Sequence, residues 1–110
     1  MNMTERRDKG LAYISDEEVF AEQAVCRRIL QKLNFMDRSD FKGIAKVVKE
    51  LLGKSENAMI NPPFYCDYGK HIEVGKNFFA NYNCTILDVA KVKIGDNCQM
   101  APNAAIYTAG

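Results

Sequence analysis

Apolar residues recur at helical spacing through the first half of the chain. The longest apolar stripe consists of Val19, Cys26, Ile29, Leu30 and Leu33. Ser15 and Glu18 form a capping box before it, because the Ser15 hydroxyl can accept from the amide three residues on and Glu18 can bond back. Asn34 follows the stripe as a stop signal, so we predict a helix over about residues 15–34.

A second stripe predicts a helix over about residues 40–52, with Gly53 as a left-handed C-cap. Its apolar positions are Phe41, Ile44, Ala45, Val48, Leu51 and Leu52. A shorter helix is expected over about residues 4–13, although Gly10 weakens it. Helices this short cannot bury their stripes alone, so they must pack on a larger body.

The pattern changes after the polar segment 54–57 and Asn61-Pro62-Pro63. Ile72-Glu73-Val74-Gly75-Lys76-Asn77 returns as Val92-Lys93-Ile94-Gly95-Asp96-Asn97, 20 residues later. Aliphatic or small residues also recur every six positions: Val74, Ala80, Ile86 and Val92, then Ile94, Met100 and Ile106. Such units predict a hexapeptide β-helix, while ordinary alternating strands remain an alternative.

The spacing has a geometric reason. Three hexapeptides close a triangular coil, in which the apolar residue of each unit points to the axis and Gly or Asn occupies the corners. One turn would take about 18 residues, so we interpret the 20-residue offset as one turn plus a two-residue bulge near Ala90 and Lys91. Cys66 and Cys84 are 18 residues apart and would then stack in adjacent coils.

Charge and composition exclude several classes. The 110 residues carry 15 Lys+Arg against 14 Asp+Glu, a balance that argues against a dedicated nucleic-acid binder. The longest uncharged run, residues 97–110, is too short and too polar to span a membrane. The charged start after Met1 is not a signal peptide, so we expect a cytoplasmic location.

Histidine and cysteine limit the chemistry further. His71 is the single histidine, so one chain cannot build a three-histidine zinc site, and no metal is expected. His71 is also the only in-chain candidate base, but its place between Lys70 and Ile72 favours an exposed turn. The chain has no C-x-x-C pair, which favours reduced buried thiols over disulfides or a metal cluster for Cys26, Cys66, Cys84 and Cys98.

Segments 62–69, 75–84, 94–97 and 101–110 closely resemble the maltose/galactoside O-acetyltransferase family of hexapeptide-repeat acyltransferases. The N-terminal helices are similar to that family's N-terminal segment. The resemblance implies a mainly β fold, a left-handed parallel β-helix, with residues 1–60 as a helical segment and 61–110 as the first, incomplete coils. It also implies a homotrimer that binds acetyl-CoA as donor and a sugar hydroxyl as acceptor between its subunits.

The resemblance also assigns candidate site residues. Asn81, in Ala80-Asn81-Tyr82-Asn83, matches an Asn that stabilises the transition state, where an amide donor faces the developing oxyanion. Asn83 is the better candidate for a corner residue of the coil. By motif alone the two positions would be equivalent.

Three acids are implied as acceptor contacts beside Asn81. Asp16 matches such an acid within one residue, although it could equally be a first-turn helix acid. Asp67 occupies a contact position where other members carry a small polar residue. Asp88 lies next to another acceptor-site acid, whose own position is held here by Val89. The acceptor sugar is therefore left open.

In the family the general base is a histidine that directly follows the Tyr-Thr-Ala-Gly stretch, which here is residues 107–110. We therefore expect a sugar O-acetyltransferase cut short, inactive as these 110 residues and poorly folded, because solenoids need three or more capped repeats. The alternative is a non-catalytic, trimer-forming hexapeptide-repeat protein. A zinc lyase of the same coil class is disfavoured by the histidine count. The gene sequence after codon 110 discriminates among them.

Overall fold

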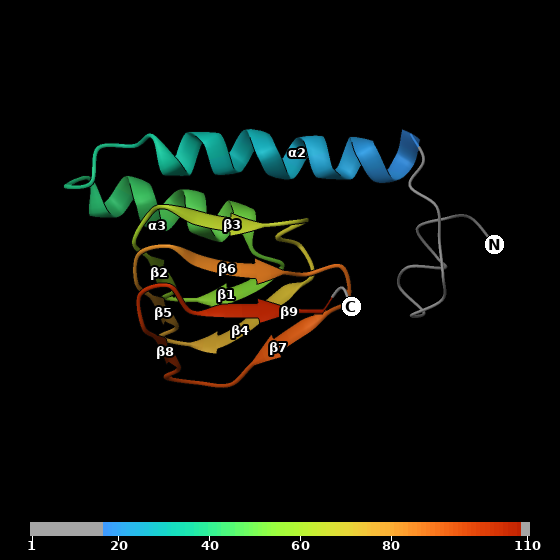
Figure 1. The fold of residues 1–110 in the computed structure, drawn as a ribbon. Coiled ribbons are helices and arrows are strands. Elements are labelled where there is room, and N and C mark those ends of the chain that lie inside the picture. The colour runs from blue at the N-terminus through green and yellow to red at the C-terminus, as the bar shows by residue number, and fades with distance from the viewer. Residues whose placement is uncertain (1–16, 109–110) are drawn as a thin grey trace.

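The computed structural model describes residues 17–108, and within them two helices precede a series of short strands (Figure 1). Helix α2 spans Glu17–Asn34 and helix α3 spans Phe41–Leu51, close to the predicted bounds. The expected helix over residues 4–13, the Ser15 cap and Asp16 lie outside the described residues.

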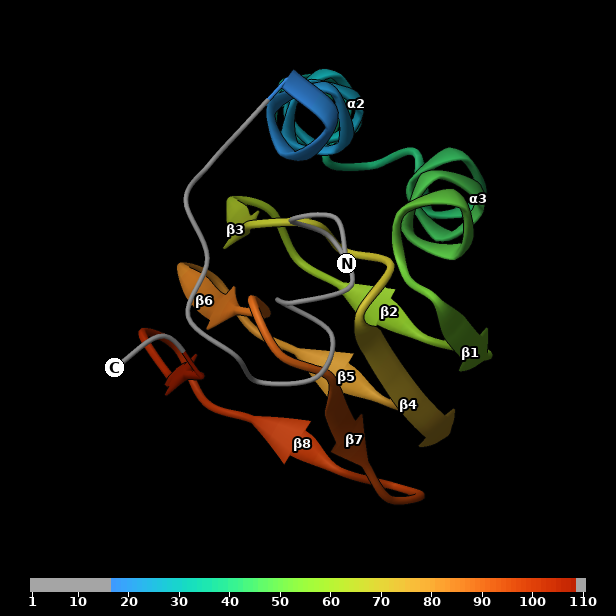
Figure 2. The same ribbon diagram turned by 90° about the vertical axis from the view of Figure 1, so that its right-hand side faces the viewer.

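The strands form three parallel sheets, which the chain visits in rotation. They are β1 (Lys54–Glu56), β2 (Met59–Ile60), β3 (Phe64–Cys66), β4 (Ile72–Lys76), β5 (Phe79–Ala80), β6 (Cys84–Leu87), β7 (Val92–Ile94), β8 (Gln99–Met100) and β9 (Ala105–Tyr107). The sheet orders are β1-β4-β7, β2-β5-β8 and β3-β6-β9, seen as three columns in Figure 2. The predicted left-handed parallel β-helix is confirmed, and its first two strands, β1 and β2, lie within the segment 1–60 assigned above to the helical part.

The strand register gives one turn 20 residues. Met59 pairs with Phe79, Phe64 with Cys84, and Ile72 with Val92. The two residues beyond 18 lie in each coil at the same corner, formed by residues 67–71 between β3 and β4 and by residues 88–91 between β6 and β7. We call this the wide corner.

The prediction that Cys66 stacks on Cys84 is wrong, because the wide corner lies between these two residues. Cys66 pairs with Ile86 instead.

Left-handed asparagines form the two narrower corners. Asn57, Asn77, Asn83, Asn97 and Asn103 all have φ between +57° and +66°. Asn tolerates this region better than most residues, because its short polar side chain can bond locally. The corner role expected of Asn83 is confirmed.

Gly53 does not have the expected left-handed C-cap conformation. Helix α3 ends because Leu52 turns extended, at φ −76° and ψ 152°. The Gly53 amide then donates to the Ile72 carbonyl oxygen, and a Cβ at Gly53 would lie 2.1 Å from the carbonyl oxygen of Lys70. Glycine is needed here for a close backbone approach.

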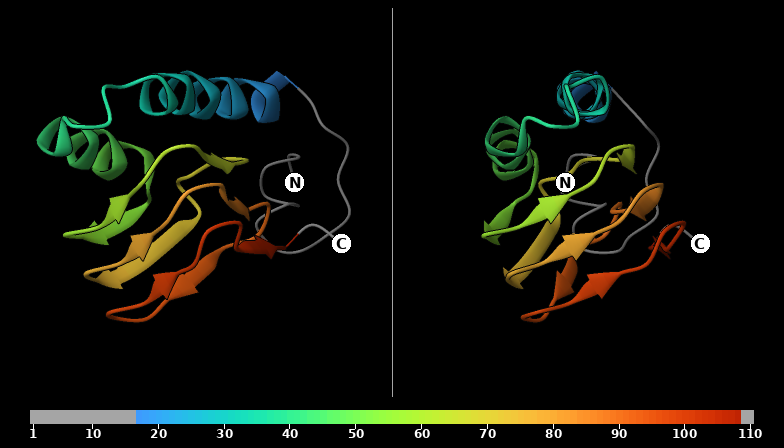
Figure 3. Two further views of the ribbon diagram at one scale, coloured as in Figure 1. Left: turned by 60° about the vertical axis from the view of Figure 1, so that its left-hand side comes forward. Right: turned by 90° about the vertical axis from the view of Figure 1, so that its left-hand side faces the viewer.

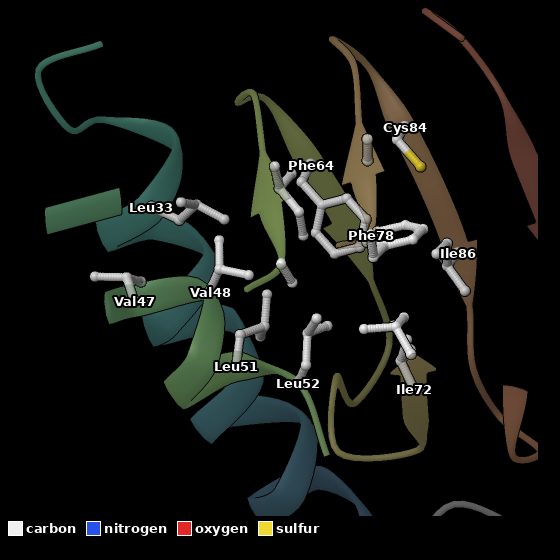
Figure 4. Packing of buried hydrophobic residues seen from close by; sticks show 14 of the residues in the cluster. Leu33, Val47, Val48, Leu51, Leu52, Phe64, Ile72, Phe78, Cys84 and Ile86 are labelled. Atoms are coloured by element: carbon white, nitrogen blue, oxygen red, sulfur yellow. The ribbon is translucent and has the colours of Figure 1, made fainter. Parts of the chain in front are cut away.

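Both helices lie across one end of the coil (Figures 1 and 3). Leu33 from α2 and Val48 and Leu51 from α3 point toward Phe64 and Ile72 of the strands, and all five are buried (Figure 4). One apolar core therefore continues from the helical layer into the coil axis. The stripes that could not be buried alone are buried on the solenoid.

A side chain of α2 also pairs with the edge of a sheet. Strand β3 is the outer strand of β3-β6-β9, and Asn34 both donates from Nδ2 to the Phe64 carbonyl and accepts at Oδ1 from the Phe64 amide, each at 2.9 Å. Arg38 donates to the carbonyl of Pro62 nearby. The Asn34 amide thus takes the place of a neighbouring strand.

Candidate functional site

The wide corner is held together by a buried carboxylate. Asp88 has no exposed surface, and its Oδ1 accepts from the amides of Asp67 at 2.9 Å and Tyr68 at 3.0 Å. Its Oδ2 is buried without a hydrogen-bond partner in the part of the chain that the structure describes. The second coil therefore fixes the backbone of the first at this corner, and one carboxylate oxygen retains an unused acceptor.

His71 belongs to the same corner and is half-buried rather than exposed. Its Nδ1 lies 2.7 Å from the Asp88 carbonyl oxygen, and its ring centroid lies 4.6 Å from that of Tyr68. Gln23 of α2 donates to the Tyr68 hydroxyl at 3.3 Å. These contacts orient His71 within the corner.

A pocket of about 230 Å³ lies between α2 and the wide corner. Its lining is Glu22, Val25, Ile29, Tyr68, Lys70 and His71. The volume is below the range of about 300–1,000 Å³ that is usual for small-molecule sites. It is therefore a small pocket among ligand sites.

Asp67 lies partly exposed at the same corner. Burial, followed by the repulsion from Asp88, raises the pKa of the Asp67 carboxyl, while Arg27 and His71 act in the opposite direction. Asp67 and Asp88 thus form an acidic pair, of which Asp67 is the accessible member. A carboxylate so placed can accept hydrogen bonds from ligand hydroxyl groups.

Asn81 lies at a different corner, directly after β5. Its backbone amide donates to the Met100 carbonyl at 3.0 Å, and its Oδ1 accepts from the Tyr82 amide at 2.9 Å. Among residues 17–108 no hydrogen-bond partner of its Nδ2 is recorded, and Asn81 is not one of the left-handed residues. Its side-chain amide is therefore oriented through its oxygen while its nitrogen can donate to a ligand.

The predicted site residues fall into two groups. Asp67 and Asp88 meet at the wide corner, whereas Asn81 lies where the chain passes from β5 to β6. Asp16 lies outside the described residues. One chain therefore does not bring all of the candidates to one place.

The sequence analysis missed the pocket beside the wide corner, which Tyr68 and Lys70 line together with α2. The two residues by which the repeat exceeds 18 were the available signal, because extra residues at one corner must bulge outward there.

Neither described helix is long and apolar enough to cross a membrane. Across residues 17–108, no three His, Cys, Asp or Glu side chains are placed to hold a metal ion together.

No protein-family model matches the sequence. Individual proteins and solved structures do match it, and their names agree with one another. Galactoside O-acetyltransferase of Escherichia coli is 35% identical over 112 aligned residues, which cover 100% of this chain and 55% of that protein. The crystal structure of a maltose O-acetyltransferase from Clostridium difficile matches with a TM-score of 0.97 and 36% identity, covering 100% of this chain and 60% of that one.

A galactoside acetyltransferase in complex with coenzyme A matches with a TM-score of 0.89 and 34% identity, over 96% of this chain and 54% of that one. The chain thus spans about half the length of the relatives it matches. The resemblance drawn from the sequence motifs is confirmed in both sequence and fold.

Proposed function

We propose that this chain, a relative of the maltose and galactoside O-acetyltransferases, forms part of an enzyme that moves an acetyl group from acetyl-CoA to a sugar hydroxyl. The observation that carries the proposal is the close match of the whole chain to a maltose O-acetyltransferase, at a TM-score of 0.97 and 36% identity. A coenzyme A complex among the relatives supports acetyl-CoA as the donor.

The proposed reaction is a direct acyl transfer. The acceptor hydroxyl attacks the thioester carbonyl carbon, a carbon–oxygen bond forms, and the carbon–sulfur bond then breaks. The hydroxyl proton passes to a general base and from it to the departing thiolate. The Nδ2 of Asn81 donates to the oxyanion of the tetrahedral intermediate, which is the charge that such a donor stabilises best.

Asp67 and Asp88 orient the acceptor in this proposal. The partly exposed carboxylate of Asp67 binds sugar hydroxyls, while Asp88 holds the Asp67 and Tyr68 amides in place. Asp16, which lies outside the described residues, is proposed for the same role of contacting the acceptor. His71 lies away from the position after residues 107–110 at which the resemblance places the base, so we do not assign it as the base.

The separation of the two groups supports a site shared between chains, and we propose that these chains form the homotrimer that the resemblance implies. A site that needs both Asn81 and the acidic pair is completed when one chain's β5–β6 corner faces the wide corner of another. The outer face of β3-β6-β9 carries Tyr65 and Tyr107, which are 48% and 67% exposed, and such aromatic side chains suit packing between chains. Sedimentation of the purified protein tests this, and a monomer carrying full activity would exclude it.

We also propose a cytoplasmic location. All four cysteines are free, and Cys26 and Cys66 lie close together as thiols, which suits a reducing compartment.

The decisive experiment measures acetyl transfer to maltose and to a galactoside by the gene product that contains this chain. Asn81→Ala should lower kcat by about 10²–10³-fold, with the melting temperature and the KM for acetyl-CoA little changed. Wild-type kcat in that variant would exclude Asn81 as the oxyanion donor. An intact trimer without turnover on any sugar would favour the non-catalytic alternative.

We expect no turnover from these 110 residues alone, because the histidine that the resemblance implies as base is not among them. Turnover above background would contradict this.

A further inference from the structure

Two thiols from different layers of the molecule lie against each other. The Sγ of Cys26, on α2, is 3.5 Å from the Sγ of Cys66, on β3. The Cys26 Sγ also lies 3.8 Å from the Cys66 carbonyl oxygen. Cys26 is buried, whereas Cys66 is only partly buried, so Cys66 is the more accessible residue of the pair. The proposed acetyl transfer uses neither sulfur.

The other two cysteines provide an internal comparison. The recorded sulfur contact of Cys84 is with the thioether of Met100, at 3.8 Å, and a thioether cannot close a disulfide with a thiol. Among residues 17–108, the contact between Cys26 and Cys66 is the one recorded between two thiols. Burial and then Cys98 raise the pKa of the Cys84 thiol, so these two thiols also lie in the same region, but among residues 17–108 the direct sulfur–sulfur contact between thiols is that of Cys26 with Cys66.

We propose that Cys26 and Cys66 are a redox-modification site, at which a small disulfide of the glutathione class links α2 covalently to β3. The sulfur–sulfur bond length is about 2.05 Å, so the two sulfurs must approach by about 1.5 Å. The partly buried Cys66 side chain can provide this movement. The site is independent of the proposed acetyl transfer.

The reaction is two thiol–disulfide exchanges. The Cys66 thiolate attacks one sulfur of the small disulfide, a mixed disulfide forms, and one small thiolate leaves. The Cys26 thiolate then attacks the Cys66 sulfur and releases the second small thiol. Two protein thiols are oxidised, one small disulfide is reduced to two thiols, and the two protein protons pass to the departing thiolates.

In the reduced protein the contact between the two thiols lowers the reactivity of Cys66. Its hydrogen bond with Cys26, followed by burial, raises the pKa of the Cys66 thiol. Because the thiolate is the attacking species, the reaction is slow and needs an oxidising glutathione ratio. The disulfide would close a loop between residues that are 40 apart in sequence, which includes α3, β1 and β2.

The test equilibrates the purified protein with glutathione buffers of increasing oxidised fraction, alkylates the remaining thiols and maps the digest by mass spectrometry. We expect the number of alkylated thiols to fall from four to two, with one cross-linked product joining the Cys26 and Cys66 peptides. The melting temperature should rise by several degrees, because the link constrains the unfolded chain, and dithiothreitol should reverse the shift.

Matched variants separate the pair from the other thiols. Cys26→Ala and Cys66→Ala should each lose both the cross-link and the temperature shift, while Cys98→Ala keeps them. Circular dichroism of each reduced variant checks that it folds. Four alkylated thiols at the most oxidising ratio, glutathione adducts without a cross-link, or a link that includes Cys84 or Cys98 would each overturn the proposal.

Discussion

At the scale of single residues, position in the coil decides what an identical side chain does. Asn81 and Asn83 are two residues apart, yet only Asn83 has a left-handed backbone, at φ +59°. Asn83 is therefore a structural residue, and Asn81 keeps its Nδ2 for a ligand. The sequence motif could not separate them without the resemblance, because both are Asn beside a strand.

A pair of substitutions at Asn83 tests the corner role. Asn83→Ala should lower the free energy of unfolding by about 1–2 kcal/mol, because an alanine Cβ is strained in the left-handed region. Asn83→Gly should stay within a few tenths of a kcal/mol, since glycine has no Cβ. Urea unfolding measures both, with Asn81→Ala as control. Equal losses for Ala and Gly would show that the side chain, not the backbone, matters.

The acidic pair predicts a dependence on pH. The pKa of Asp67 is raised above its ordinary 3.8 in the folded protein, so ionisation of this carboxyl costs stability as the pH rises through the raised pKa. Asp67→Asn should therefore stabilise the protein above that window, by no more than about 0.5 kcal/mol for a partly exposed group, and should have no effect well below pH 3.8.

Asp37 is a control for Asp67, because its pKa is shifted in the opposite direction. The side chain and the amide of Ser39 hydrogen-bond to Asp37 and lower its pKa. Its contribution to stability is present above pH 3.8 and lost as the pH falls through the lowered pKa. Asp37→Asn should thus destabilise at neutral pH. Urea unfolding of both variants from pH 7 downward tests the two signs, and parallel profiles would contradict the assignment.

At the scale of elements, the sheets need a partner at their outer edge, and a helix provides it. Asn34 makes two hydrogen bonds to Phe64 of β3, and both backbone groups of Phe64 would otherwise lack a partner on that side. An edge left unpaired and partly buried is costly. The side chain of Asn34, the last residue of α2, thus makes the two hydrogen bonds that a neighbouring strand would make.

Asn34→Leu should lower the free energy of unfolding by roughly 2 kcal/mol or more, because it leaves the Phe64 amide and carbonyl unpaired. Asn34→Asp should lose less, since one acceptor for the amide remains. Gln31→Leu, an exposed amide one turn earlier, is the matched control. Similar stability of the Asn34→Leu and Gln31→Leu proteins in urea would rule out the edge-pairing role.

Sequence periodicity predicted the elements well and their contacts only in part. The 20-residue return of Ile72-Glu73-Val74 as Val92-Lys93-Ile94 is the register observed between β4 and β7. The 18-residue turn was assumed from the hexapeptide rule, and it misplaced Cys66 because the extra residues recur in every coil. The contact between Cys26 and Cys66 joins a helix to a strand 40 residues later, and no local pattern contains such a pairing.

At the scale of the whole molecule, the helical layer and the coil share one core. Leu33 from α2 and Leu51 from α3 are fully buried in the same cluster as Phe64 of the first coil. Repeats in a solenoid are stabilised only by their neighbours, so the first coil would fray if nothing covered it. Here the two helices cover that end. The helices and the coil should therefore unfold together.

Leu33→Ala should lower the free energy of unfolding by about 2–5 kcal/mol, because it opens a cavity between the helical layer and the coil. Phe35→Ala, at a residue 84% exposed, should change it by no more than about 0.5 kcal/mol. Helical circular dichroism and tyrosine fluorescence should report the same transition in both variants. Separate transitions would mean that the layers fold independently.

The 20-residue register, which holds in all strand pairs except at the start of β1, also restricts how such a chain can change its length in evolution. Duplication of one whole coil would leave every axial residue above a residue of its own kind, as Ile86 already lies beside Ile106. A gain or loss of one residue within a strand would turn the side chains that follow it in that strand from the axis to solvent, unless a bulge absorbs the change, as in β1. The wide corner, where Ala90 and Lys91 are exposed, is the place where small insertions can accumulate without that penalty. Insertions at the wide corner would then change the loop beside Asp67 and Asp88 among relatives while the strands of the coil keep their register.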